Sequence, residues 1–283
     1  MSAVAVPARA KTSAPATAWA FVRRHTLTAY SLLFFLYLLV PIAIVIAFSF
    51  NQPVGKFNYT WNKFTFDNWR YWNGVPGIQS AIVLSLEIAL LASVIATILG
   101  TLIALALVRY GFRGRSVTNL LIFLPLSTPE IVMGASLLTL FLNLNFVFGF
   151  WTILIAHVTF CISFAVVSVR ARLVGFDRHL EEAAMDLGAN EWVTFRKVTL
   201  PLIAPAILAA LLLCFAVSID DFVVTYFNSG SEVTFPLFVW GAARIGAPPQ
   251  VNVIGSAIFL IAVSAMLVNV LVQTRRTKGA PSE

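Results

Sequence analysis

The stretch SAIVLSLEIALLASVIATILGTLIALALV, residues 80–108, contains a single charged residue, Glu87. A helix needs roughly 20 mostly apolar residues to cross the hydrocarbon core of a bilayer, which is about 30 Å thick. The stretch lacks the period-two alternation that a membrane-spanning strand requires. Because a backbone in lipid must satisfy its own hydrogen bonds, we expect this segment to be a transmembrane helix.

Five further stretches share its length and apolar character. They are residues 29–50, 117–141, 147–169, 201–222 and 251–272. The whole chain has 283 residues, of which 59% are hydrophobic and 11% charged, and its mean hydropathy is +0.89. Such a chain has too little polar surface to cover a water-soluble globule. The sequence therefore predicts an all-α integral membrane protein with six transmembrane helices.

The positions of the 19 Lys and Arg residues predict how these helices are oriented. Cytoplasmic loops carry an excess of basic residues. On one predicted side of the membrane there are only four: Lys56, Lys63, Arg70 and Arg244. The remaining 15 lie on the other side, so both termini are predicted to be cytoplasmic, in a chain of the cytoplasmic or inner membrane. The net charge of +7 is then a topology signal and does not indicate nucleic-acid binding.

The predicted membrane domain covers residues 27–274 and has a tail at either end. Residues 1–26 are rich in Ala, Pro and Ser and have no apolar face, which predicts a disordered tail. Residues 275–283 form the second cytoplasmic tail. On the outer side, the aromatic residues of 51–79 form either an interfacial belt or a binding site. A second outer segment is expected to contain a short helix over residues 236–245.

Residues 170–200 form one long cytoplasmic loop, which we expect to fold as two short helices. The first helix presents a narrow face at helical spacing, formed by Leu180, Ala183, Ala184 and Leu187. Gly188 suits the left-handed end of this helix, and Asn190 suits the cap of the next. Alanines permit close approach of another backbone, and the carboxylates of the loop attract a basic partner. The hairpin is either a docking element or a solvated loop.

The same loop carries a long motif. Its residues are Glu182, Ala183, Ala184, Gly188, Val198, Thr199, Leu200 and Pro201. The motif resembles the EAA loop of ABC importer permeases, in which Ile usually stands at the position of Val198. The resemblance implies the type I permease fold and a coupling helix that docks into an ATPase subunit. It implies that the coupling residues are Glu182, Ala183, Ala184, Gly188, Leu200 and Pro201.

Four other segments, residues 64–69, 99–115, 129–134 and 218–224, resemble permeases of the spermidine/putrescine transporter type, in particular their second permease subunit. This resemblance implies that the chain forms half of a translocation pathway for a polyamine, either putrescine or spermidine. It also implies three kinds of partner: ATP-binding subunits, a second homologous permease subunit and an extracytoplasmic substrate-binding protein. A permease of the same class for another small solute is the alternative.

Carboxylates within the predicted spans are candidates for the substrate pathway. There are four of them, Glu87, Glu130, Asp220 and Asp221. A charge at the bilayer centre costs about 2.5–3.5 kcal/mol on insertion scales, so such residues usually face a cavity. Pro125 and Pro129 flank Glu130, so the third span is either broken at a substrate path or merely kinked. Glu87 lies near the outer end of the second span, where it either snorkels, pairs with a partner or lines the path.

Asp220 and Asp221 lie near the outer end of the fifth span. A helix C-terminus is already negative, so carboxylates are unfavourable there, which favours a functional role over simple solvation. If the substrate is a polyamine, these two residues and Glu130 would offset its ammonium groups. Tyr226 and Trp240 would add cation–π contacts.

The sequence contains none of the patterns GxxxxGK[ST], HExxH or GxSxG, so we expect no catalytic activity, and ATP hydrolysis must come from another chain. No cofactor is expected, and three dispersed histidines predict no metal site. His157, deep in the fourth span, is expected to be a hydrogen-bonded core residue. The stronger rival function is a secondary transporter in which Glu130 carries a coupling proton, although no inverted repeat supports it.

Overall fold

The structure is a computed structural model that describes the backbone of residues 14–278 and the side chains of residues 25–264 and of Leu267. The regular secondary structure of the described chain is helical apart from one pair of two-residue strands, in agreement with the predicted all-α class. It divides into two compact units. One unit comprises Met1–Gly74 and Gly246–Glu283, and the other comprises Val75–Ile245.

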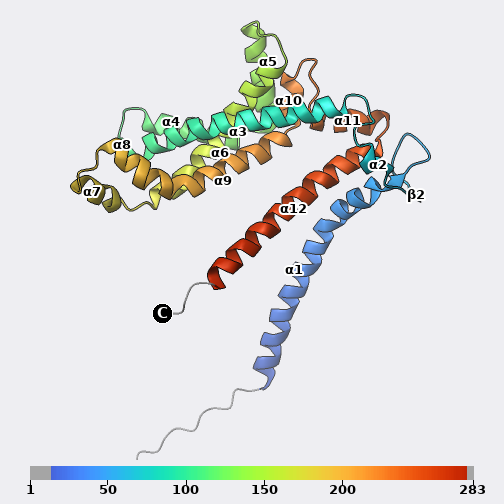
Figure 1. Cartoon of the computed structure of the whole chain (residues 1–283), viewed down its shortest axis with the longest axis horizontal. Helices are drawn as coiled ribbons and strands as arrows, with labels where there is room; N and C mark the ends of the chain where they lie inside the picture. The colour runs from blue at the N-terminus through green and yellow to red at the C-terminus, as the bar shows by residue number, and fades with distance from the viewer. Residues whose placement is uncertain (1–13, 279–283) are drawn as a thin grey trace, which may run out of the picture. The chain divides into compact units, whose positions relative to one another are not determined.

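The first unit contains two long helices and the strand pair. Its elements are α1 (Ala14–Ser49), β1 (Asn51–Gln52), β2 (Lys63–Phe64), α2 (Asp67–Arg70) and α12 (Pro249–Lys278). Helices α1 and α12 contact each other, and Figure 1 draws them in blue and red. The strands pair antiparallel, with Asn51 opposite Phe64.

The ends of the first unit differ from the predicted tails. Helix α1 begins at Ala14, inside the segment 1–26 for which composition predicts disorder. Alanine has the highest helix propensity of all residues, which explains the extension. The predicted tail 275–283 likewise begins within α12, which runs to Lys278. Residues 1–13 and 279–283 lie outside the described residues.

Asparagine side chains stabilise the loop that follows α1. Asn51 Nδ2 donates to Asn58 Oδ1 at 2.6 Å, and Asn68 Nδ2 donates to the carbonyl of Asn51 at 2.8 Å. The ring of Phe50 stacks on Phe64 and Trp69, with 5.5 Å between the centroids in each pair. The aromatic residues of this loop therefore pack partly on one another, a role that neither predicted alternative included.

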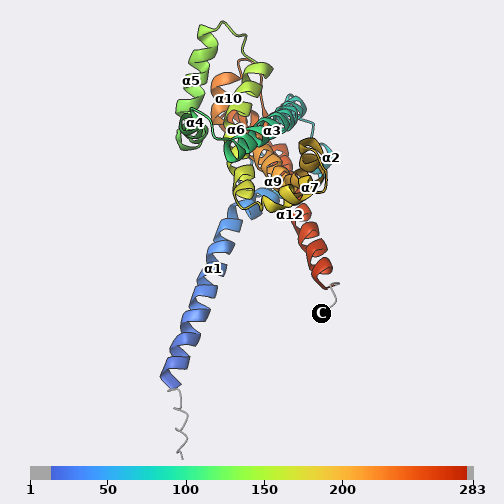
Figure 2. The ribbon, with the colours of Figure 1, turned by 90° about the vertical axis from the view of Figure 1, so that its left-hand side faces the viewer.

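The second unit is built on three long helices, α3 (Ile78–Arg109), α6 (Phe150–Val174) and α9 (Leu200–Ile219). The three helices pack against each other, and both Figure 1 and Figure 2 show them side by side. Small buried residues fill their contacts, among them Ala96, Ala104, Ala156, Ala165 and Ala210. Small residues let helix backbones approach closely, which is how helices associate in a membrane.

The third predicted span is broken and not merely kinked. It consists of α4 (Arg115–Ser127) and α5 (Glu130–Asn143), which meet at an angle of 112°. Thr128, between them, has an extended backbone with φ −83° and ψ 133°. The residue before a proline avoids the helical conformation, so Pro129 accounts for the break. Glu130 is consequently the first residue of a new helix.

Shorter helices occupy both ends of the second unit. They are α7 (His179–Asp186), α8 (Glu191–Thr194), the π-helical turn η1 (Phe195–Thr199), α10 (Val223–Asn228) and α11 (Phe235–Ile245). Figure 1 shows α7 and α8 at one end of the three long helices, and α10 and α11 toward the other. Helix α11 confirms the short helix that the sequence predicts over residues 236–245.

Among residues 25–264, four helices are long and apolar enough to cross a membrane: His25–Ser49, Ile78–Arg109, Phe150–Val174 and Glu191–Asp220. The bent pair of α4 and α5 makes a fifth candidate if it counts as one span. Within α12, Pro249–Ser264 is a shorter apolar segment. The count of six spans and the cytoplasmic termini stay predictions.

Helices α3 and α6 pack so closely at Gly100 that one added methyl group should have a large effect on folding stability. A Cβ atom at Gly100 would lie 2.5 Å from the Cβ of Ala165 and 3.1 Å from the backbone nitrogen of Val166. We therefore expect Gly100→Ala to destabilise the folded chain by about 1–3 kcal/mol through overpacking. The measurement is the thermal unfolding midpoint in detergent.

The matched control is Gly241→Ala, because Gly241 lies in helix α11 and a methyl group added to it would meet no atom within 4 Å. Alanine favours a helix over glycine by about 1 kcal/mol, so this variant should unfold no earlier than the wild type. Equal midpoints for Gly100→Ala and the wild type would contradict the close packing of α3 on α6.

Candidate functional site

A cavity of about 520 Å³ lies where the broken helix α4–α5 meets α6 and the junction of α9 with α10. Its lining comprises Pro125, Leu126, Thr128, Glu130, Met133, Phe160, Phe164, Val217, Asp220, Asp221, Phe222, Val223 and Val224. Both helix breaks of the unit therefore border one space. All of these residues belong to the unit Val75–Ile245.

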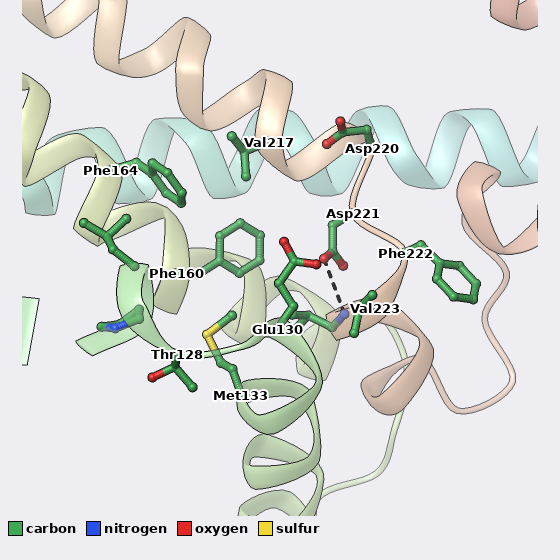
Figure 3. Close-up of a pocket in the computed structure, with 13 residues that line it drawn as sticks. Thr128, Glu130, Met133, Phe160, Phe164, Val217, Asp220, Asp221, Phe222 and Val223 are labelled. Atoms are coloured by element: carbon green, nitrogen blue, oxygen red, sulfur yellow. Dashed lines mark hydrogen bonds between the residues drawn. The ribbon is translucent and has the colours of Figure 1, made fainter. Parts of the chain in front are cut away.

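The cavity brings together three of the four predicted pathway carboxylates, Glu130, Asp220 and Asp221. Figure 3 shows that the side chains of Glu130 and Asp221 point toward each other, whereas Asp220 lies at the end of α9. None of the lining residues is Lys, Arg or His. A cavity with several carboxylates and no basic residue is suited to a cation.

The carboxylate of Asp221 is tied into the protein. Its Oδ2 accepts hydrogen bonds from the backbone N–H and the hydroxyl of Thr225, both at 2.8 Å. Its Oδ1 accepts from the N–H of Val224 at 3.3 Å. Only 7% of its side chain is exposed. The expectation that this acid sits unfavourably at the C-terminus of a helix is therefore wrong, because the chain restarts as α10 and Asp221 satisfies the first N–H groups of that helix.

His157 completes this network from helix α6. Its side chain is 2% exposed, and its Nδ1 lies 2.7 Å from the hydroxyl of Ser218. Its Nε2 lies 2.9 Å from the hydroxyl of Thr225 and 3.4 Å from Oδ2 of Asp221. An imidazole with a proton on Nε2 satisfies these contacts if Ser218 donates to Nδ1 and Thr225 donates to Asp221. The prediction that His157 is a hydrogen-bonded core residue is confirmed.

The other two cavity acids are more accessible. Glu130 and Asp220 are both exposed residues. Glu130 occupies the first turn of α5, where a carboxylate is favourable because a helix N-terminus is positive. Asp220 is the residue that ends α9. Of the three carboxylates, these two have the most freedom to bind a ligand.

The remaining predicted pathway residues do not line the cavity. Glu87 lies on α3 and is exposed. The guanidinium of Arg244 lies 4.5 Å from the ring centroid of Trp240, so one cation already occupies this ring. The sequence analysis missed Phe222, which lines the cavity and has its ring 5.6 Å from Tyr226 and 5.1 Å from Trp240. Its position directly after two carboxylates was the available signal.

The predicted hairpin is present at the opposite end of α9. Gly188 ends α7 with φ +88°, and the side chain of Asn190 accepts from the N–H of Val193, so both turn predictions are confirmed. The side chain of Glu182 is 62% exposed and contacts His179 within its own helix. Ala183 is exposed, and Ala184 is half-buried.

Two further motif residues lie where the hairpin is followed by helix α9. Leu200 and Pro201 are the first two residues of α9, directly after the π-helical turn η1. The preceding residue is Glu181, whose side chain is less exposed than that of Glu182 and forms hydrogen bonds with Arg109 and Thr199. The sequence analysis did not distinguish Glu181 from the other carboxylates of the loop.

The network around Asp221 predicts the effect of removing one hydroxyl. Thr225→Val keeps the shape of the side chain but removes the contacts with His157 and Asp221, leaving buried polar atoms unpaired. We expect this variant to lose about 1–3 kcal/mol of folding stability. Thr101→Val is the matched control, since the buried hydroxyl of Thr101 has no hydrogen-bond partner among the described residues. Thermal unfolding in detergent should separate the two variants, and equal midpoints would contradict the network.

Two sequence relatives and one solved structure are similar to this chain. The chain is 39% identical over 247 residues to the spermidine/putrescine transport system permease protein PotC of Haemophilus influenzae, covering 86% of this chain and 95% of the relative. It is 39% identical over 240 residues to the putrescine transport system permease protein PotI of Escherichia coli, covering 80% and 83%. A solved chain of a bacterial ABC transporter involved in the import of the acidic polysaccharide alginate has a TM-score of 0.64 at 20% identity, covering 94% and 99%.

The solved chain of the alginate transporter has the same fold as this chain, and the two sequence relatives align with most of its length. Residues 96–278 match the family described as binding-protein-dependent transport system inner membrane component. This match spans the three long helices of the second unit in large part, the cavity and the hairpin. The chain therefore belongs to the family of inner membrane components of binding-protein-dependent transport systems.

Proposed function

We propose that the chain is a permease subunit of an ATP-driven importer, that it forms half of a translocation pathway, and that its substrate is a polyamine, putrescine or spermidine. The observation that supports the substrate assignment is the cavity, which has three carboxylates and no basic residue in its lining. Two sequence relatives are named as polyamine transport permeases, which supports the same substrate class.

The chemistry of the cavity suits a flexible polycation. Each primary ammonium of a polyamine has three N–H donors and leaves most of its hydration shell on entering a confined site. Glu130 and Asp220, which are accessible, would replace those water contacts with charged hydrogen bonds. Phe160, Phe164 and Phe222 line the same cavity and would contact the methylene groups between the ammonium groups. Phe222 could also place its ring face against an ammonium.

The partner set follows from the family and from the hairpin. A binding-protein-dependent system includes a substrate-binding protein, which we place on the extracytoplasmic side. We assign the hairpin of α7 and α8 to docking with an ATP-binding subunit, through Glu182, Ala183, Ala184, Gly188, Leu200 and Pro201. A second homologous permease subunit would supply the other half of the pathway, and the six predicted spans would place both termini in the cytoplasm.

Uptake into proteoliposomes tests the function. The complete complex is reconstituted with ATP inside and the binding protein outside, and radiolabelled putrescine and spermidine are compared with a neutral sugar and an organic anion. We expect polyamine uptake that depends on ATP and on the binding protein. ATP-dependent uptake of the sugar or the anion in place of a polyamine would contradict the substrate assignment. Uptake that is independent of ATP would contradict the assignment as an ATP-driven importer.

The cavity acids are tested in the same assay. Glu130→Gln and Asp220→Asn should each lower polyamine uptake by about 10-fold, the loss expected from one charged hydrogen bond of roughly 1.5 kcal/mol. Glu87→Gln is the matched comparison, because Glu87 lies on α3 outside the cavity lining, and it should retain most of the uptake. Asp221 is unsuited to this test, since its loss would also disturb α10. Uptake by Glu130→Gln and Asp220→Asn that equals uptake by the wild type would remove these acids from the pathway.

The docking assignment generates a separate prediction. Glu182→Lys reverses an exposed charge of α7, so we expect the amount of chain in the membrane to stay unchanged while uptake falls by at least about 10-fold, a typical size of coupling between sites. Parallel measurement of uptake and ATP hydrolysis checks this. Glu191→Lys, the same reversal at another exposed carboxylate of the hairpin, is the control. Uptake that is equal in both variants and the wild type would contradict docking through Glu182.

A further inference from the structure

The carboxylate of Glu181 joins three elements that are far apart in the sequence. It accepts hydrogen bonds from the guanidinium of Arg109, the last residue of α3, and from the hydroxyl of Thr199, the last residue of η1. Arg109 Nη2 also lies 3.3 Å from the hydroxyl oxygen of Thr199. The three side chains therefore contact one another pairwise, and each comes from a different element.

This cluster is enclosed, in contrast to the neighbouring acid. The side chain of Glu181 is 14% exposed, that of Arg109 is 28% exposed, and Thr199 is fully buried. Glu182, one position further along, is 62% exposed. Successive residues on a helix point in directions about 100° apart, so one of the two carboxylates faces the body of the protein and the other faces outward.

A second contact ties the start of the hairpin to the same end of α3. The guanidinium of Arg178, directly before α7, donates to the carbonyl of Val108 at 3.0 Å. The last carbonyls of a helix have no partner within the helix and carry a partial negative charge. Arg178 and Arg109 therefore place two cations at the C-terminus of α3, and one of them also holds Glu181. The hairpin is attached to α3 at two points.

The third element of the cluster leads to the cavity. Thr199 is followed by α9, whose 20 residues span about 30 Å at 1.5 Å per residue. At the far end of α9 lie Val217 and Asp220, which line the cavity. The turn before α9 is π-helical, with the N–H of Leu200 donating to the carbonyl of Phe195. Pro201 has no N–H to offer the carbonyl of Lys197, and π turns are frequent at functional sites.

We infer that Glu181 is the positioning residue that transmits movement of the hairpin to α3 and α9, through Arg109 and Thr199. This inference rests on the proposed function, because it requires an ATPase subunit that moves the hairpin. Glu181 acts inside the permease, while Glu182 faces the partner. A displaced hairpin carries the start of α9 with it, and α9 moves the cavity acid at its other end. Without the carboxylate, the hairpin can move while α9 stays behind.

The test has two measurements in the reconstituted complex. The first is uptake per ATP hydrolysed. The second is the distance between spin labels on Asp186 of α7 and Leu208 of α9, in the absence and presence of ATP. Both positions are exposed. Glu181→Gln should lower uptake per ATP by about 10-fold. In the wild type the label distance should stay constant on adding ATP, and in the variant it should change. Glu87→Gln, which changes an exposed carboxylate of α3 outside both the hairpin and the cavity lining, should behave as the wild type.

Charge reversal separates this role from a purely structural one. Arg109→Glu and Glu181→Arg should each lower uptake per ATP, and the double variant should restore it. Thr199→Val keeps the ion pair and should lower the ratio on its own, so it decides the matter if Glu181→Gln fails to assemble. Unchanged ratios, or a double variant no better than its parents, would overturn the inference. Failure of the proposed function would appear separately, as absence of ATP-dependent uptake by the wild type.

Discussion

A helix that breaks in apolar surroundings must find new partners for its backbone, and this requirement explains where the cavity lies. The break between α4 and α5 occurs at Pro129, which has no N–H to satisfy. The break between α9 and α10 occurs at Asp221, whose carboxylate accepts the first N–H groups of α10. Both breaks border one space. Asp221 therefore both satisfies backbone N–H groups of α10 and contributes to the polar part of the cavity wall.

The same requirement divides the cavity acids into two kinds. Asp221 is held by Thr225 and His157, and a carboxylate with this many partners has little capacity left for a ligand. Glu130 and Asp220 are exposed, and their charges are opposed by no basic residue in the lining. The held acid keeps α10 in place, and the accessible acids face the space that α10 helps to form. A positioned scaffold with a few free charged groups is how ligand sites commonly achieve orientation.

At the other end of α9 the hairpin shows a similar division. Glu181 and Glu182 are adjacent and chemically identical, yet one is enclosed by Arg109 and Thr199 and the other is largely exposed. Helix α9 links this cluster to the cavity through a continuous run from Leu200 to Ile219. Thr199, which bonds Glu181, therefore lies directly before α9, and the cavity acid Asp220 lies directly after its last residue. Coupling between distant sites requires such a contiguous physical connection or a shared equilibrium.

Local signals in the sequence were enough to predict the helical class, the turns of the hairpin and the identities of the cavity acids. Apolar runs indicate the helices, a glycine after a helix indicates a turn, and carboxylates within apolar runs indicate the cavity acids. Each of these signals depends only on neighbouring residues. Asn190 and Gly188 adopt the predicted cap and turn for the same reason. Which acid is free depends on tertiary packing instead. Asp221 meets His157 from a helix more than 60 residues away in the chain, and Glu181 meets Arg109 from 72 residues away. Such partners are set by the packing of α3, α6 and α9, and no local pattern encodes which side chains that packing brings into contact.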